Sequence, residues 1–257
     1  MSRFRLLHAA LILVASFAAA ALPAAAQSNK TDRGQAAAVN TELALAYMRD
    51  GNLAAAREKI EKALQQNPRT AKTQMAAGFI YDALKDVRKA RNHYDQAVRL
   101  GKDDPDVLNN AAVYFCRTGE YRRGEQLLLQ AADSPLYKTP AVAYTNAGRC
   151  ARGDGRNKDA EQHFRQALGI NPKQPDALLQ MAEVSHALGN GLQARAFLER
   201  YAGVAPITPA TLWLGRRIEL GLGDTAQAQR YAQRIKNEFP MSIEAGKLFD
   251  EEHQGRP

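Results

Sequence analysis

After its first 26 residues, the chain places apolar residues every three or four positions, which is the period of an α-helix. Glycine, proline or asparagine separates most predicted helices from the next. The segment 53–66 illustrates the pattern, because Ala56, Ile60 and Ala63 share one face while charged residues occupy the other. The pattern predicts an all-α protein.

The predicted helices form an internal repeat with a period of about 34 residues. The repeated pattern is a turn glycine, a small residue, a large apolar residue and a second small residue, often followed by proline. Successive turn glycines lie 36, 34 and 34 residues apart, at Gly119, Gly155, Gly189 and Gly223. Gly51 lies two periods before Gly119, and Lys85 occupies the intervening position.

Six such units over residues 37–244 are typical of tetratricopeptide repeats, so we predict a right-handed α-solenoid of six helix pairs. The spacing of 36 predicts a longer loop between the third and fourth repeats, around the segment Ser134–Pro140 with its two prolines. We assign residues 27–36 to a flexible N-terminal segment and residues 245–257 to a polar C-terminal tail.

The first helix of each pair should line the concave face of the solenoid. Helical projection places these residues on that face in the first three repeats: Leu45, Met48, Arg49, Met75, Phe79, Asp82, Asn109 and Val113. In the last three repeats it places Thr145, Arg149, Arg152, Leu179, Glu183, His186, Trp213 and Arg217.

The two halves of this predicted groove differ in chemistry. We expect Leu45, Met48, Met75, Phe79 and Val113 to form an apolar groove for a partner helix or strand. The alternative is that the methionines and Phe79 complete the core. A secondary, charged groove is expected from residues of the last three repeats: Arg149, Arg152, Glu183, Trp213 and Arg217.

The N-terminus is typical of a secretory signal. Arg3 and Arg5 precede an apolar run, and the small residues 24–26 resemble a cleavage site, so we assign residues 1–26 to a signal peptide. An uncleaved membrane anchor is the alternative. Export places the chain in the periplasm, and peripheral association with the outer membrane is compatible with the sequence. No cysteine lies near the cleavage site to accept a lipid.

Other chemistry is not indicated. The net charge is +8, but basic residues alternate with acidic ones without a basic run, so we expect no nucleic-acid partner. No phosphate-binding loop, metalloprotease motif or hydrolase motif is present, and we expect no catalytic activity, cofactor, metal or small-molecule substrate. His93 and His163 occupy the same repeat position, which we expect to face solvent.

The chain has two cysteines, Cys116 and Cys150, near the ends of neighbouring first helices. Neither has a base placed beside it by helical spacing, and no CxxC pair indicates zinc. In an oxidising compartment the pair favours a disulfide. Two separately buried thiols are the alternative.

The third to sixth repeats contain segments that ordinary tetratricopeptide proteins lack. They are "PLYKTP", "NAGRCA" and "LWLGRRIELGLGD". On these segments the chain resembles the PilF/PilW family of type IV pilus biogenesis proteins, over essentially its whole mature length. The resemblance implies a non-enzymatic pilotin that helps the outer-membrane secretin localise or multimerise and so supports pilus extrusion and twitching motility. It also implies that the apolar groove meets the secretin subunit.

The chain departs from the family in two respects. Many members carry a lipid anchor, whose acceptor cysteine is missing here. Gly124 replaces the alanine usual in the second helix, which predicts slightly looser packing of that pair. We expect a monomer. The alternative function is a generic periplasmic adaptor for another envelope assembly or secretion system.

Overall fold

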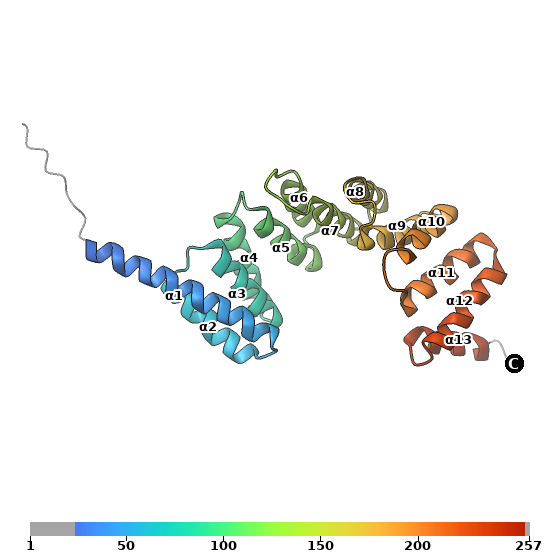
Figure 1. Cartoon of the computed structure of the whole chain (residues 1–257), viewed down its shortest axis with the longest axis horizontal. Coiled ribbons are helices and arrows are strands. Elements are labelled where there is room, and N and C mark those ends of the chain that lie inside the picture. The colour runs from blue at the N-terminus through green and yellow to red at the C-terminus, as the bar shows by residue number, and fades with distance from the viewer. Residues whose placement is uncertain (1–23, 255–257) are drawn as a thin grey trace, which may run out of the picture.

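The computed structural model describes residues 24–254, so most of the predicted signal peptide lies outside the described residues. The described part of the chain forms thirteen α-helices and no β-strand. The helices follow one another along an arch, with α1 at one end and α13 at the other (Figure 1). The prediction of an all-α solenoid of six repeats is confirmed.

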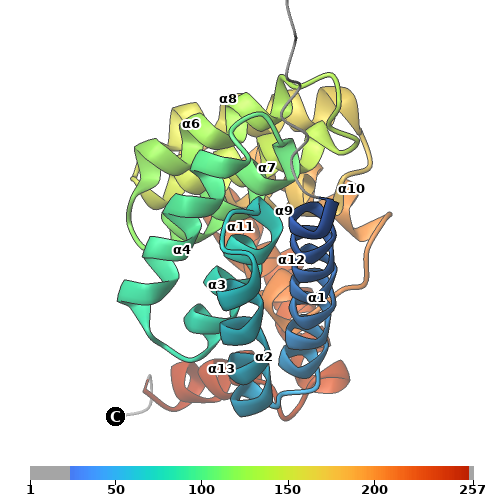
Figure 2. The same cartoon turned by 90° about the vertical axis from the view of Figure 1, so that its left-hand side faces the viewer.

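The first twelve helices form six antiparallel pairs, each joined by a short turn, and we call the first member of each pair helix A and the second helix B. The pairs are α1 (Ala24–Arg49) with α2 (Leu53–Gln66), α3 (Ala71–Ala83) with α4 (Val87–Leu100), α5 (Pro105–Arg117) with α6 (Tyr121–Ala132), α7 (Pro140–Gly153) with α8 (Asn157–Ile170), α9 (Pro175–Ala187) with α10 (Gly191–Ala202), and α11 (Pro209–Leu222) with α12 (Thr225–Glu238). Figure 2 shows α1 and α3 side by side at the N-terminal end.

Small residues on helix A face large rings on helix B and set the distance between the two helices. A Cβ atom added at Gly148 would lie 2.3 Å from the Phe164 ring, so only glycine fits there. Gly78 faces Tyr94 in the second repeat and Gly215 faces Tyr231 in the sixth. The glycines therefore let each pair approach closely enough to bury these rings.

The turn inside every repeat requires a left-handed residue. Five of these turns use the glycines that define the period, with φ between 74° and 90°. The turn of the second repeat uses Lys85, whose φ is 63°. Lys85 is therefore the single exception that the repeat alignment identified, and its side chain adopts a backbone conformation that lysine disfavours.

The connection between the third and fourth repeats is longer than the others, as predicted. It runs from residue 133 to residue 139, between α6 and α7. Tyr137 folds back from this loop and is 9% exposed, in a cluster with Leu128 and Cys150. The insertion is thus anchored to the core by an aromatic side chain.

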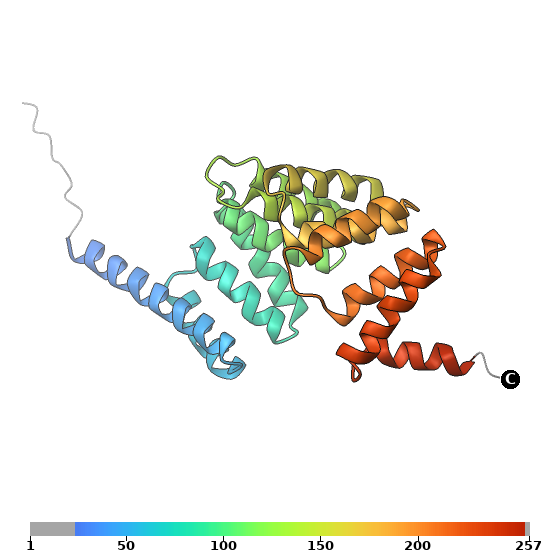
Figure 3. The same cartoon turned by 45° about the vertical axis from the view of Figure 1, so that its right-hand side comes forward.

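The ends of the solenoid differ from the sequence assignment. Helix α1 begins at Ala24 and so includes residues 27–36, which we had assigned to a flexible segment. The predicted polar tail over 245–257 is wrong for most of its length, because α13 (Ile243–Gln254) packs against α11 and α12 (Figure 3). Leu248 provides the reason: it is 3% exposed and covers Leu212 and Ile235 of the last pair.

Ion pairs join successive repeats on the helix B side. Arg123 pairs with Asp95, Arg91 with Glu120, and Arg156 with Glu125. Burial raises the pKa of the Glu125 carboxyl, but hydrogen bonds from Arg156 and His163 outweigh burial and hold that pKa below its ordinary value.

The two repeat-position histidines are half-buried, so the expectation that they face solvent is wrong. His163 binds Glu125 with its Nε2 atom 2.9 Å from the carboxylate. His93 stacks on Tyr81, and its Nδ1 atom lies 2.7 Å from the side-chain oxygen of Gln74. The His163 ring therefore joins two successive repeats, whereas the His93 ring packs against α3 of its own helix pair.

The left-handed turn predicts that Lys85→Gly stabilises the protein. The lysine side chain that is removed is exposed, whereas the backbone strain is relieved, so the free energy of unfolding should rise by about 1 kcal/mol. Urea denaturation followed by circular dichroism would measure the change. The matched control is Gly155→Ala. The added methyl group meets no neighbouring atom, so the free energy of unfolding should fall by about 1 kcal/mol because of the left-handed backbone alone. Equal stability of Lys85→Gly and the parent chain would contradict this account.

Candidate protein-binding groove

The predicted apolar groove is only partly a surface. Met75 is 6% exposed and belongs to the core cluster of the first three repeats, so its assignment to the groove is wrong. Its cluster includes side chains from α1, α2, α4 and α5 as well as from its own helix. Leu45, Met48 and Phe79 are half-buried on the edge of the same cluster. Phe79 packs edge-on against Tyr94 with 5.8 Å between ring centroids.

Val113 lies elsewhere, in a separate cleft on the concave face. It is 42% exposed and lines a hollow of about 300 Å³ between α5 and α7. The remaining lining residues are Cys116, Arg117, Tyr121, Asn146, Arg149, Cys150 and Gly153. This middle cleft thus combines one predicted apolar residue with one predicted charged residue, Arg149.

The predicted charged groove is largely assembled by the structure. A cleft of about 510 Å³ opens between α7, α9 and α11, and we call it the C-terminal cleft. Its lining includes four of the five predicted residues, and all its members are Arg152, Glu183, His186, Ala187, Ala210, Trp213, Leu214 and Arg217. Helical projection therefore placed more of the charged residues than of the apolar residues in one cleft.

Contacts inside the C-terminal cleft fix its side chains. Arg152 of α7 forms an ion pair with Glu183 of α9. Arg216 and Lys247 lie over the Trp213 ring, at 5.1 and 5.4 Å from its centroid. Burial, and to a smaller extent the charge of Arg217, lower the pKa of His186. His186 is thus held neutral over a wider pH range than a free histidine.

Helical projection misplaced Thr145 and missed two residues. Thr145 is 2% exposed and donates a hydrogen bond to the Ala141 carbonyl, whereas the next residue, Asn146, lines the middle cleft. Tyr121 lines the same cleft from the first turn of a B helix, where a projection of A helices could not find it.

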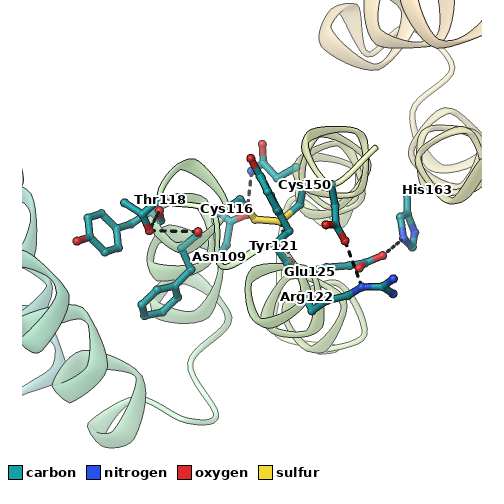
Figure 4. The surroundings of a disulfide bond; sticks show 12 residues. Asn109, Cys116, Thr118, Tyr121, Arg122, Glu125, Cys150 and His163 are labelled. Carbon is teal, nitrogen blue, oxygen red and sulfur yellow. Dashed lines mark hydrogen bonds and ion pairs between the residues drawn. A yellow bond between two sulfur atoms is a disulfide. The ribbon is translucent and has the colours of Figure 1, made fainter. Parts of the chain in front are cut away.

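The cysteines form a disulfide at the wall of the middle cleft. Cys116 of α5 and Cys150 of α7 are bonded, with their Cα atoms 5.2 Å apart (Figure 4). Tyr121 and Asn109 lie beside the bridge in the same view. The bridge connects the A helices of the third and fourth repeats.

Gly124 makes room for this bridge. A Cβ atom at that position would lie 2.3 Å from the Cys116 sulfur and 2.9 Å from the Ala112 carbonyl oxygen. The expected loosening of this helix pair is therefore wrong, because the sulfur fills the space that an alanine methyl group would occupy.

Similarity to known proteins agrees with this architecture. Tetratricopeptide repeat models match residues 37–70 and 151–207. The type IV pilus assembly protein PilF of Pseudomonas aeruginosa is 26% identical over 217 residues, which cover 84% of this chain and 86% of PilF. The crystal structure of PilW, a widely conserved type IV pilus biogenesis factor, superimposes with a TM-score of 0.77 and 27% identity, over 84% of this chain and 99% of PilW.

This similarity confirms the resemblance of the chain to the PilF/PilW proteins of type IV pilus biogenesis. The solved structure of P. aeruginosa PilF shows the same fold, with a TM-score of 0.72 and 24% identity over 86% of this chain and 99% of that chain. The similarity to PilF and PilW thus extends over most of the solenoid and is not limited to one or two repeats. The chain is accordingly a tetratricopeptide protein related to type IV pilus biogenesis factors.

The burial difference between Met75 and Val113 can be tested by truncation. Met75→Ala should destabilise the fold by roughly 2–5 kcal/mol, because it leaves a cavity in the core. Val113→Ala should change stability by less than about 0.5 kcal/mol, because the side chain is exposed. Chemical denaturation of both variants measures the difference, and equal losses would contradict the assignment of Met75 to the core.

The disulfide predicts that the unreduced, denatured protein has no thiol that reacts with a labelling reagent. Replacing both cysteines with alanine should lower the free energy of unfolding by about 3–4 kcal/mol, since the bridge closes a loop of 34 residues. Thermal denaturation with and without reductant provides the comparison. Two reactive thiols per chain, or insensitivity to reductant, would exclude the bridge.

Proposed function

We propose that this chain is a non-enzymatic type IV pilus biogenesis factor that promotes localisation or multimerisation of the outer-membrane secretin. The observation that carries the proposal is the extent of similarity: PilF and PilW each align over 84% of the chain. A generic tetratricopeptide protein matches a similar share of this chain, 83%, but with 17% identity, against 27% identity for PilW.

The concave face provides the surface for this role. Leu45, Met48 and Phe79 form an apolar strip at the N-terminal end, each half-buried against the core. Complete burial of one such residue by a partner can contribute roughly 1.5–3 kcal/mol to the free energy of binding. We assign this strip, together with Val113, to contact with the secretin subunit.

Binding and not catalysis fits the chemistry of the concave face. The two cysteines are joined in a disulfide, so neither supplies a thiolate nucleophile. Within residues 24–254, no group of three or more potential metal-binding side chains comes together. We therefore propose a protein partner and no small-molecule substrate.

We place this activity in the periplasm, with the protein exported by the predicted signal and held peripherally at the outer membrane as a monomer. No described helix is long and apolar enough to cross a membrane. The disulfide is compatible with the oxidising periplasm.

Deletion of the coding sequence tests the proposal. We expect fewer secretin multimers on native gels of envelope fractions and loss of twitching motility, both restored by the parent chain supplied in trans. Complementation with the Val113→Asp variant tests whether the groove is needed. This variant should fold, because Val113 is exposed. Unchanged multimers and normal motility after deletion would reject the pilus role and favour an adaptor for another envelope system.

A further inference from the structure

The two concave clefts carry an excess of positive charge. Their lining residues include four arginines, at positions 117, 149, 152 and 217, but a single carboxylate, Glu183. The clefts adjoin each other because Arg149 and Arg152 lie one helical turn apart on α7. We call these two neighbouring clefts, which are lined by α5, α7, α9 and α11, the basic groove.

Two of these arginines are neutralised within the chain. Arg117 forms an ion pair with Asp82 of α3, and Arg152 forms one with Glu183. Arg149 and Arg217 have no ion pair among the described residues, and both are exposed. Burial, and to a smaller extent the charge of Arg149, lowers the pKa of Arg152. Arg149 and Arg217 are therefore the two guanidiniums of these clefts that are left for carboxylates of a partner.

The groove also offers groups that bind a polypeptide. Asn146 donates a hydrogen bond to the side-chain oxygen of Asn109 across α5 and α7, at 3.1 Å. Each amide retains further donor and acceptor capacity, which suits the main-chain amides of an extended segment. Trp213 lies half-buried in the C-terminal cleft, beside Leu214, and provides an apolar surface for one side chain.

The length of the groove limits the size of the occupant. Four A helices at spacings of about 8–10 Å span roughly 24–30 Å. An extended chain covers that distance with about seven to nine residues, at about 3.3 Å per residue.

We propose that the basic groove binds an extended acidic segment of a partner protein, with carboxylates at Arg149 and Arg217 and an apolar side chain on Trp213. The proposal deepens the function proposed above, on which the identity of the partner rests. The acidic class is favoured because the unpaired groups are guanidiniums, which bind carboxylates through paired hydrogen bonds.

Intrinsic fluorescence provides a direct test, because Trp213 is the only tryptophan of the chain. The probe is a capped peptide of about eight residues in which glutamates alternate with leucine and phenylalanine, a length set by the span of the groove. We expect it to shift the Trp213 emission in a saturable manner and to bind more weakly as salt rises. The same peptide with lysine in place of glutamate should cause no shift.

Variants identify the arginines. Arg149→Gln and Arg217→Gln should each lower the affinity for the acidic peptide by roughly five- to tenfold, because each removes one charge-assisted hydrogen-bonding contact. The matched control is Arg88→Gln, an exposed arginine on the B helix α4, which should bind like the parent chain. Circular dichroism confirms that all three variants are folded.

Four outcomes would overturn the proposal: equal binding of the acidic and basic peptides, an unmoved Trp213 emission, unchanged affinity in both groove variants, or tighter binding of a single-stranded oligonucleotide of equal charge. These outcomes do not depend on the secretin. Normal secretin assembly after deletion, together with peptide binding, would reject only the pilus role. Loss of assembly without peptide binding would reject only the basic groove.

Discussion

The close approach of helix A to helix B is the constraint on which the structure depends. Where Gly148 meets the Phe164 ring there is no room for a methyl group, and the same holds where Gly215 meets Tyr231. Because these pairs are this close, the Phe164 ring is buried and the Tyr231 ring is half-buried. The A helices are left to form the inner surface of the solenoid. The spacing of the inner surface, and therefore the clefts along it, follows from where small residues stand in the sequence.

The polar side chains are divided between two faces according to this arrangement. On the helix B side, pairs such as Arg156 with Glu125 join neighbouring repeats and satisfy one another. On the concave side, the guanidiniums of Arg149 and Arg217 face a hollow without a carboxylate partner in the described part of the chain. Internal pairing thus stabilises the stack of repeats, while the unpaired charges lie where a partner can reach them.

The sequence predicted the repeat boundaries and turns because each depends on local rules. Gly51, Gly119 and Lys85 stand at left-handed positions that the period alone locates. The sequence left open whether Met75 lies in the groove or in the core, since its burial depends on how several neighbouring helices pack around it. It could not predict that α13 would pack, because one apolar residue, Leu248, decides it within a charged segment. Tyr121 entered the groove from a B helix, which no single-helix projection includes.

The covalent bridge between α5 and α7 has a mechanical consequence. A solenoid bends by small rotations at each junction between repeats, since each repeat contacts only its neighbours. Here the junction between the third and fourth repeats is fixed by Cys116 and Cys150, and Tyr137 of the long loop packs into the same cluster as Cys150. Elastic changes of curvature must therefore occur at the other junctions, so the molecule behaves as two bending arms of three repeats joined by a rigid centre.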